Sequence, residues 1–505
     1  MPSQGENMSS NLIGDANFLR STMNILLIGF GVYFTVIALI ALTAYTKNKQ
    51  SRNAGYSEII LGNRSVNYVL TALSAHASDM SDWLFMAFPG ALYAGGLIEA
   101  WIAIGLVAGM WFTWHYIAPQ LRKATEKHNC YTLSTYFEQR FSDTSGSLRL
   151  MSALISCLFF TFYIAAGLKY FGYVSEEIFH LPYTTGIFIA LICLIFYIVF
   201  GGYRTLAWID SFQALFLLTV IFFVPYFGFL QCGSWHAIVQ AAAAKQISLS
   251  FISINPKFTL NAMFLALSWA VGYFGMPHIL TKFMGISDVK QMNKAKYIGL
   301  TWQIAALTAA GMVGFIGIAY FSETLQNPEF VFINMVLHSF SPLWAGFILS
   351  SIAGATLSVV TAQVLVLVSV FTEDLYKRTL NPLATDKELV WIYRASILVI
   401  ALLSFFISLI TRTLYVQQLV SYAWMGFGSA FGPLVILSLY SKRINLHGAQ
   451  AALIVGTLVS ASWTFLAQQP IYLMFGLNIP SAIPGFMLSI IAAYTASYAT
   501  KNASL

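Results

Sequence analysis

The sequence carries very little charge for its length. Only 9% of its 505 residues are Asp, Glu, Lys or Arg, whereas 58% are hydrophobic. A soluble globular protein has about 25% charged residues, and a compact soluble fold of this length has no room to hide so much apolar surface. The composition therefore excludes a water-soluble protein, and we predict an all-α polytopic membrane protein surrounded by lipid.

Sequence signals for several other classes are also absent. The four cysteines have no paired spacing, so the sequence favours neither a disulfide framework nor a cysteine-based metal site. No HExxH or paired-aspartate GxGD motif is present, which argues against a membrane-embedded enzyme, and we expect no cofactor. Residues 1–23 lack the basic stretch of a signal peptide, so we expect the first apolar run to be a retained helix.

Long apolar runs define the predicted membrane spans. A helix needs about 20 apolar residues to cross the hydrocarbon core. By this criterion we predict a single transmembrane domain, 1–505, and a short cytoplasmic helix at 131–141. Its thirteen spans are expected near 24–45, 67–95, 97–118, 148–172, 184–201, 208–231, 260–282, 297–321, 342–371, 388–410, 416–440, 448–467 and 480–499.

The basic residues predict the orientation. An odd number of spans puts the two termini on opposite sides of the membrane, and Lys and Arg are enriched in cytoplasmic loops. With the N-terminus outside and the C-terminus inside, few of the 26 basic residues fall on the outer side. The outer set is Arg20, Lys169, Lys245, Lys257 and Arg412, and the other 21 basic residues, Lys282 among them, are assigned to the inner loops. The net charge of +7 is therefore a topology signal rather than a sign of nucleic-acid binding.

The second predicted span contains a polar interruption. The stretch SAHASDMSDW, Ser74 to Trp83, places two carboxylates and a histidine between apolar flanks. A charge at the bilayer centre costs roughly 2.5–17 kcal/mol, depending on the scale, and irregular backbone there must line a cavity or be buried in protein. We predict a helix broken at Ser74–Ser81 that offers oxygens to an ion or substrate. Close helix packing explains the small residues Ala75 and Ala77, but not the carboxylates.

Two further segments carry related signals. In LSWAVGYFGMPHILTKFM, residues 267–284, two glycines and Pro277 favour a second broken helix. Trp269 and Tyr273 share a face with Pro277, which fits either core packing or a binding site. In SSIAGATLSVVTAQ, residues 350–363, hydroxyls such as Ser358 and Thr361 suit a hard cation such as sodium. The small residues beside them also fit an ordinary helix-packing face.

These motifs resemble the sodium/solute symporter family, and within it the bacterial members that carry proline. The resemblance covers roughly residues 55–465 and rests on LSAHASDMSDWLFMAFPGALY, TLSTYFEQRF, LFFTFYIAAG, GGYRTLAWIDSFQA, GYFGMPHILTKFM, TEDLYK, ELVWIYR and SYAWMGFGSAFGP. It implies a LeuT-type fold of thirteen helices in a bacterial inner membrane. Inverted five-helix repeats would occupy 67–231 and 260–440, with an extra N-terminal helix at 24–45 and two C-terminal helices within 448–499.

The resemblance also implies roles for individual residues. The sodium ion would bind the carbonyl groups of Ala77 and Met80 together with Ala355 and Ser358, and Asp79 would govern sodium dependence. The residues expected to bind a small zwitterion, L-proline, are Ser81, Tyr163, Trp269, Tyr273 and Pro277.

Gating or coupling is expected of a third group, namely Arg64, Asp210, Arg394, His76 and Asp82. Three positions depart from the family pattern. Val359 stands where a second hydroxyl is usual, Asp82 replaces a glycine, and His76 replaces a small residue. Because histidine titrates near physiological pH, these departures leave an alternative open: proton-coupled symport of proline or a related zwitterion such as a betaine.

Overall fold

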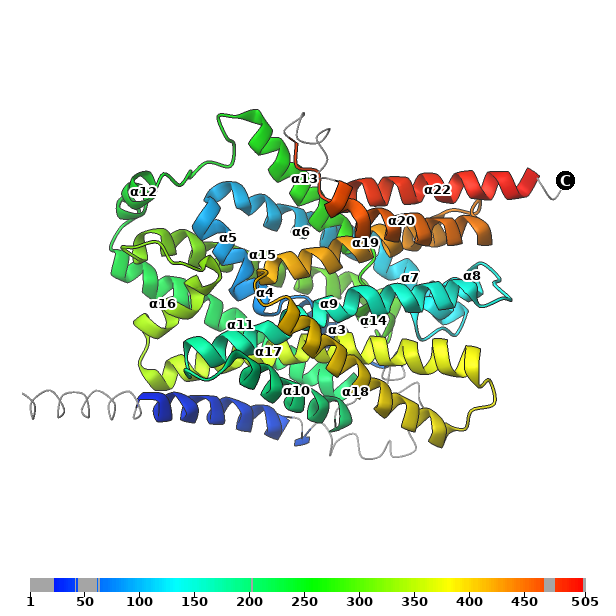
Figure 1. Ribbon diagram of the computed structural model, residues 1–505, viewed down its shortest axis with the longest axis horizontal. Coiled ribbons are helices and arrows are strands. Elements are labelled where there is room, and N and C mark those ends of the chain that lie inside the picture. Colours follow the sequence, from blue (N-terminus) through cyan, green and yellow to red (C-terminus); the bar gives the residue numbers. More distant parts are fainter. Residues whose placement is uncertain are drawn as a thin grey trace, which may run out of the picture.

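The computed structural model describes residues 22–40, 42–43, 61, 64–200, 203–466 and 477–502. Within these residues the chain is helical apart from turns and one isolated β-bridge, Val66 to Ile286. Most long helices run roughly parallel in one bundle, with α20 and α22 along one side and the N-terminal helix along the opposite side (Figure 1). In the described part of the chain, nine helices are long and apolar enough to cross a membrane, or ten if one bent pair is a single span.

Each of the predicted segments overlaps a helix or a set of short helices. The N-terminal helix is Thr22–Ile40. The others in chain order are α3 Tyr68–Ala77, α4 Asp82–Phe85, α5 Ala87–Gly95, α6 Trp101–Phe112, α7 Ala118–Lys127, α9 Ser147–Glu177, α10 Tyr183–Phe200, α11 Tyr203–Cys232, α13 Pro256–Gly272, α14 Pro277–Met284, α15 Met292–Tyr320, α17 Pro342–Ser369, α18 Asp386–Ile410, α19 Val416–Tyr440, α20 Leu446–Leu466 and α22 Ala482–Asn502.

Shorter helices connect the long ones. The predicted surface helix is present as α8, Leu133–Arg140, whereas α12, Trp235–Ala244, and α16, Val331–Ser339, were not predicted. Two π-helical stretches extend longer helices, η4 at Thr113–Ile117 and η7 at Val370–Leu380. The described residues also form three short 3-10 helices: η3 Leu97–Ala100, η5 Val289–Gln291 and η6 Pro328–Phe330.

The second span is broken, as its polar residues predict. Asn67 begins α3 by accepting a hydrogen bond from the backbone N–H of Leu70 at 2.9 Å, and the helix ends at Ala77. Residues 78–81 are irregular, and Ser81 then caps the single turn α4 through the backbone N–H of Trp83. The break is narrower than predicted, because the N–H of Ser78 still bonds the carbonyl of Ser74 in helical fashion.

The second break separates α13 from α14, which are bent by 45°. Pro277 is the first residue of α14. A backbone N–H at this position has no partner within the helix, so the missing N–H of proline costs no helical hydrogen bond. Gly272 ends α13 against the indole of Trp424, and a Cβ there would lie 1.8 Å from the indole nitrogen. A side chain at Gly272 would therefore push α13 away from α19, so the glycine is needed for close helix contact.

The broken helices lie inside the bundle. α3 packs against α11, α14 and α15, and α4 contacts α17. α13 packs against α6 and α19, while α9 contacts α10, α17, α18 and α19. Both breaks are therefore surrounded by long helices rather than by lipid, which satisfies the condition for irregular backbone at membrane depth.

Candidate functional site

The two helix breaks contact each other directly. Nε2 of His278, on the first turn of α14, lies 3.1 Å from the carbonyl oxygen of Ser78. Because a carbonyl only accepts, this ring nitrogen carries the proton. The Tyr273 hydroxyl donates to Oδ2 of Asp79 and accepts from Nε2 of Gln303 at 2.8 Å. A movement of one break would therefore be transmitted to the other. The sequence analysis did not single out Gln303, and it gave His278 no role of its own.

An aromatic cluster adjoins the breaks. The Trp269 ring centroid lies 5.1 Å from that of Trp83 and 5.6 Å from that of Trp424. Tyr273 packs edge-on against Trp424 at 4.8 Å, and the Trp424 indole donates to the carbonyl of Trp269 at 2.9 Å. Tyr163, from α9, contacts the His278 ring at 5.8 Å. Helices α4, α9, α13, α14 and α19 thus bring most of the predicted substrate residues together.

Several buried polar atoms in this region have no hydrogen-bond partner among the described residues. They are Oδ2 of Asp82, Oγ of Ser78 and the indole nitrogens of Trp83 and Trp269. Buried polar groups are normally hydrogen-bonded. One carboxylate acceptor and two indole donors are the groups that a small zwitterion needs, since its ammonium donates and its carboxylate accepts.

The predicted sodium residues lie where α3 and α4 face α17. The carbonyl oxygens of Ala77 and Met80 accept no backbone hydrogen bond from any described residue. Ala355 and Ser358 are buried on α17, and the adjacent Thr356 hydroxyl accepts the backbone N–H of Asp82 at 3.1 Å. Free carbonyls facing a hydroxyl-bearing helix are suitable ligands for a hard cation.

A buried charge cluster adjoins this position. Asp210, on α11, accepts hydrogen bonds from the Ser358 hydroxyl through Oδ1, and from the Ser74 hydroxyl at 2.6 Å and Nζ of Lys282 at 2.9 Å through Oδ2. Lys282 also donates to the Ser74 hydroxyl at 2.9 Å. Four helices, α3, α11, α14 and α17, therefore meet at one carboxylate.

The position of Lys282 differs from the loop position that the orientation prediction gave it. Lys282 lies at the end of an apolar run, and sequence reasoning treated it as a cytoplasmic loop charge. Instead α14 buries it, with a side chain 6% exposed, against Asp210. The signal that could have found it is its place four residues after His278 on the same short helix, which puts it on the helix face directed toward α3.

The expected gating residues are not all close together. His76 lies between Trp114 and Trp302, and its ring accepts from the Trp114 indole at 3.4 Å. The ring forms no described hydrogen bond with the carboxylate of Asp79 or Asp82. Arg64 ties the start of α3 to the end of α7 by donating to the carbonyls of Thr125 and Cys130 at 3.0 and 2.7 Å. Arg394 is exposed on α18, away from the charge cluster.

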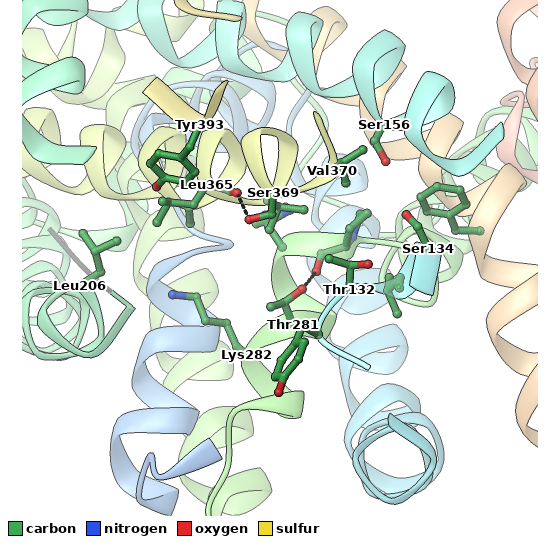
Figure 2. A pocket seen from close by; sticks show the side chains of 17 residues that line it. Thr132, Ser134, Ser156, Leu206, Thr281, Lys282, Leu365, Ser369, Val370 and Tyr393 are labelled. Atoms are coloured by element: carbon green, nitrogen blue, oxygen red, sulfur yellow. Dashed lines mark hydrogen bonds between the residues drawn. The ribbon is translucent and has the colours of Figure 1, made fainter. Parts of the chain in front are cut away.

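A cavity opens on one side of the breaks. It begins at Pro277 and His278 and extends past Lys282 and Ser369 to the loop at Tyr131. Figure 2 shows Thr281 and Lys282 on α14, with Thr132 and Ser134 across the cavity. Residues of α9, α11, α17, α18 and α19 also line it. The site therefore has a route toward the end of the bundle that carries α8.

Buried polar contacts hold helices together at the opposite end of the bundle. Glu329, next to α16, accepts from the backbone N–H groups of Val416 and Gln417 at 3.2 and 3.1 Å, which caps the start of α19. Burial raises the pKa of this carboxyl above its usual value. The backbone of Pro328 and Glu329 lies directly against Gly90 of α5. Figure 1 shows α16 and α8 at opposite ends of the bundle.

Two broken helices with free carbonyls, beside buried polar atoms that have no described partner, are typical of a secondary active transporter. The chain belongs to the sodium:solute symporter family, which matches residues 59–456. The members of this family are transporters, so the chain is a transporter and not an enzyme.

Relatives of known function match nearly the whole chain. It is 37% identical over 488 residues to the sodium/proline symporter of Escherichia coli K12, covering 95% of this chain and 94% of that protein. It is 36% identical over 483 residues to the osmoregulated proline transporter OpuE of Bacillus subtilis, covering 94% and 95%.

Solved structures show the fold. A Na+-coupled sialic acid symporter matches with a TM-score of 0.75 at 17% identity, covering 94% of this chain and 98% of that one. MhsT in complex with L-phenylalanine matches with a TM-score of 0.51 at 15% identity, covering 87% and 99%. The fold is therefore of the LeuT type, as the resemblance implied.

Proposed function

We propose that the chain carries L-proline into the cell by sodium-coupled symport with alternating access. The main support is the pair of helix breaks that hold each other through His278 and Ser78, beside polar atoms left without partners. Relatives named as proline transporters, at 36–37% identity over almost the full length, support proline as the substrate.

In this proposal the sodium ion binds between α3, α4 and α17. The carbonyls of Ala77 and Met80, the Ala355 position and the Ser358 hydroxyl supply oxygens. Val359 offers no hydroxyl, but Thr361 has a buried hydroxyl without a described partner one turn along α17, and Asp210 is already bonded to Ser358. The protein thus has oxygens available to replace the missing ligand.

Proline binds next to the ion, in the proposed mechanism. Its ring lies against Trp269 and Tyr273, bounded by Tyr163 and Pro277. Its ammonium pairs with Asp82, and its carboxylate takes the indole donors and the Ser81 hydroxyl at the start of α4. Asp79 couples the two ligands because it holds Tyr273 across the breaks. Coupling of this kind is reciprocal, so proline strengthens sodium binding as much as sodium strengthens proline binding.

The architecture extends the proposal. We infer thirteen spans in a bacterial inner membrane, with repeats at 67–231 and 260–440, a helix at 24–45 before them and two helices within 448–499 after them. The N-terminus lies outside and the C-terminus inside. In this orientation the cavity beside Lys282 faces the cytoplasm and Glu329 closes the outer side, so Arg64 and Arg394 lie toward the inner face.

The proton-coupled alternative rested on the missing hydroxyl at Val359 together with the nearby His76 and the extra carboxylate of Asp82. His76 is enclosed by two tryptophans and has no described hydrogen bond to either carboxylate, so sodium is the proposed ion. Proteoliposomes given a sodium gradient should accumulate labelled proline, whereas a proton gradient without sodium should not. Accumulation driven by a proton gradient alone would overturn sodium coupling. If a betaine inhibited the uptake of labelled proline as strongly as unlabelled proline does, the assignment of proline as the substrate would be overturned.

Replacing Asp79 with Asn tests the link between the breaks. A hydrogen bond to a charged group contributes about 1.5–3 kcal/mol, so Asp79→Asn should raise the sodium concentration for half-maximal uptake by about 10- to 100-fold. Tyr273→Phe should give a change in the same direction. Glu323→Gln, an exposed carboxylate in a loop, is the control. Sodium dependence equal to that of the unmodified protein would remove Asp79 from the coupling path.

A further inference from the structure

A second cavity, of about 320 Å³, lies outside the transport site. It is bounded by the end of α7, by α8 and by the C-terminal end of α19. Its basic lining residues are Lys123, Lys127, His128, Arg140 and Lys442, and no Asp or Glu is among its lining residues. A concave surface with charge of one sign attracts ligands of the opposite sign.

The positive charge of this cavity is not neutralised within the described chain. Lys123 and Lys127 are exposed on one face of α7, one turn apart, where like charges repel. Neither they nor Lys442 forms an ion pair with a described residue. The nearby Glu126 is already paired with Arg122, at 2.9 Å. Burial and then the charges of Lys127 and Arg140 lower the pKa of His128.

Arg140 gives the cavity a fixed wall. Its Nε donates to the carbonyl of Ser438 at 2.7 Å and an Nη to the carbonyl of Ser441 at 2.9 Å. These bonds satisfy carbonyls at the end of α19 and hold α8 against it. A guanidinium has five N–H donors, so Arg140 keeps others for a ligand.

Aromatic side chains of the kind found at a membrane interface lie at the edge of the cavity and beside it. Tyr440 lines the cavity, is exposed, and donates to the carbonyl of Tyr116 at 2.7 Å. Tyr116 and Trp111 are also exposed, with ring centroids 6.0 Å apart. Exposed Trp and Tyr collect at the level of lipid headgroups. The cationic cavity thus lies where the apolar span Leu97–Lys127 leaves the bilayer.

We propose that this cavity binds the phosphate headgroup of an anionic phospholipid, with Lys123, Lys127 and Lys442 as the charged contacts and Arg140 as the fixed donor. Basic pockets between membrane helices suit such headgroups. The aromatic mouth gives the acyl chains a place beside α6 and α7, which a free phosphate would not use. The bound lipid joins α7 and α8 to the connection after α19.

The test compares lipid retention by the full-length protein and two charge-matched variants. The pocket variant is Lys123→Gln/Lys127→Gln/Lys442→Gln. The control is Lys290→Gln/Lys294→Gln/Lys296→Gln, which removes the same charge from η5 and the first turns of α15, outside the cavity. Each protein is purified in detergent with phosphatidylglycerol or phosphatidylcholine, and bound lipid is counted by native mass spectrometry. Lys442→Gln alone serves if the triple variant is poorly folded, as judged by proline uptake.

We expect the pocket variant to bind phosphatidylglycerol at least 10-fold more weakly than the unmodified and control proteins, with phosphatidylcholine bound weakly by all three. Millimolar inorganic phosphate should not displace the lipid. Equal loss in the control variant would show a general charge effect and overturn the site. Displacement by phosphate would show an anion site rather than a lipid site, and equal retention of phosphatidylcholine would overturn recognition of the headgroup charge.

Discussion

Replacing Asp210 with Asn should lower sodium-driven proline uptake by about 100-fold or more. The carboxylate is buried and accepts hydrogen bonds from Ser74, Ser358 and Lys282. Removing one partner of a buried ion pair costs about 3–5 kcal/mol, because the other charge remains buried without compensation. Each 1.4 kcal/mol lowers a population or a rate by a factor of ten. The conformations of the transport cycle in which Lys282 is buried are therefore populated much less. Initial uptake rates in proteoliposomes measure the effect.

A double variant separates the two roles of Asp210. Asp210→Asn/Lys282→Met removes both charges, which is often nearly neutral for stability, so the amount of folded protein should recover. If Asp210 also serves the sodium ion, the sodium dependence of the double variant should remain altered. Recovery of wild-type sodium dependence would show that Asp210 acts only as the ion-pair partner of Lys282 and does not serve the sodium ion. Asp288→Asn, which neutralises an exposed carboxylate, should leave uptake unchanged.

The helix breaks were predictable because their causes are local. Pro277 lacks the N–H that a continuous helix requires, and the polar residues after Ala77 provide hydroxyl and carboxyl groups that compete with helical hydrogen bonds. The prediction placed the first break too early because Ser74 also looks like a breaker. In the structure its carbonyl keeps its helical bond, and its hydroxyl is used by Asp210 instead.

The charge cluster was not predictable in the same way. Asp210 and Ser358 are separated by 148 residues, and no local pattern indicates that α11 and α17 would bring them together. Lys282 was misassigned because a lysine at the end of an apolar run looks the same whether it enters the cytoplasm or turns inward. The short helices α12 and α16 were missed because a search for apolar runs long enough to span a membrane does not detect helices of 10 and 9 residues.

The surroundings of two residues that depart from the family pattern could also not be predicted from the sequence. His76 and Asp82 are six residues apart, and both depart from the family pattern. The first helix break lies between them, so His76 belongs to α3 and Asp82 to α4. His76 consequently packs against Trp302 of α15, whereas the backbone of Asp82 meets Thr356 of α17. Asp82 is thus available to a ligand and His76 is part of the packed core.

Replacing Trp269 with Ala should raise the proline concentration for half-maximal uptake by about 30- to 100-fold. A buried large aromatic removes about 150–250 Å² from water, worth about 4–6 kcal/mol at 25 cal/mol per Å². Trp83 and Trp424 cover part of the ring, so we assign about half of this energy to proline. Because Trp269 has no described contact with Asp210 or Ser358, the sodium dependence should change less than 3-fold, an order-of-magnitude expectation.

A second substitution distinguishes the ring of Trp269 from its indole N–H. Trp269→Phe keeps an aromatic surface but removes the donor that has no described partner, and a hydrogen bond to a charged carboxylate contributes about 1.5–3 kcal/mol. If the donor binds the carboxylate of proline, Phe should lose about 10-fold or more in affinity. Trp391→Ala, at an exposed position on α18, should lose none. A weaker sodium affinity with unchanged proline affinity in Trp269→Ala would assign α13 to the ion path, because only the substrate is expected to touch this ring.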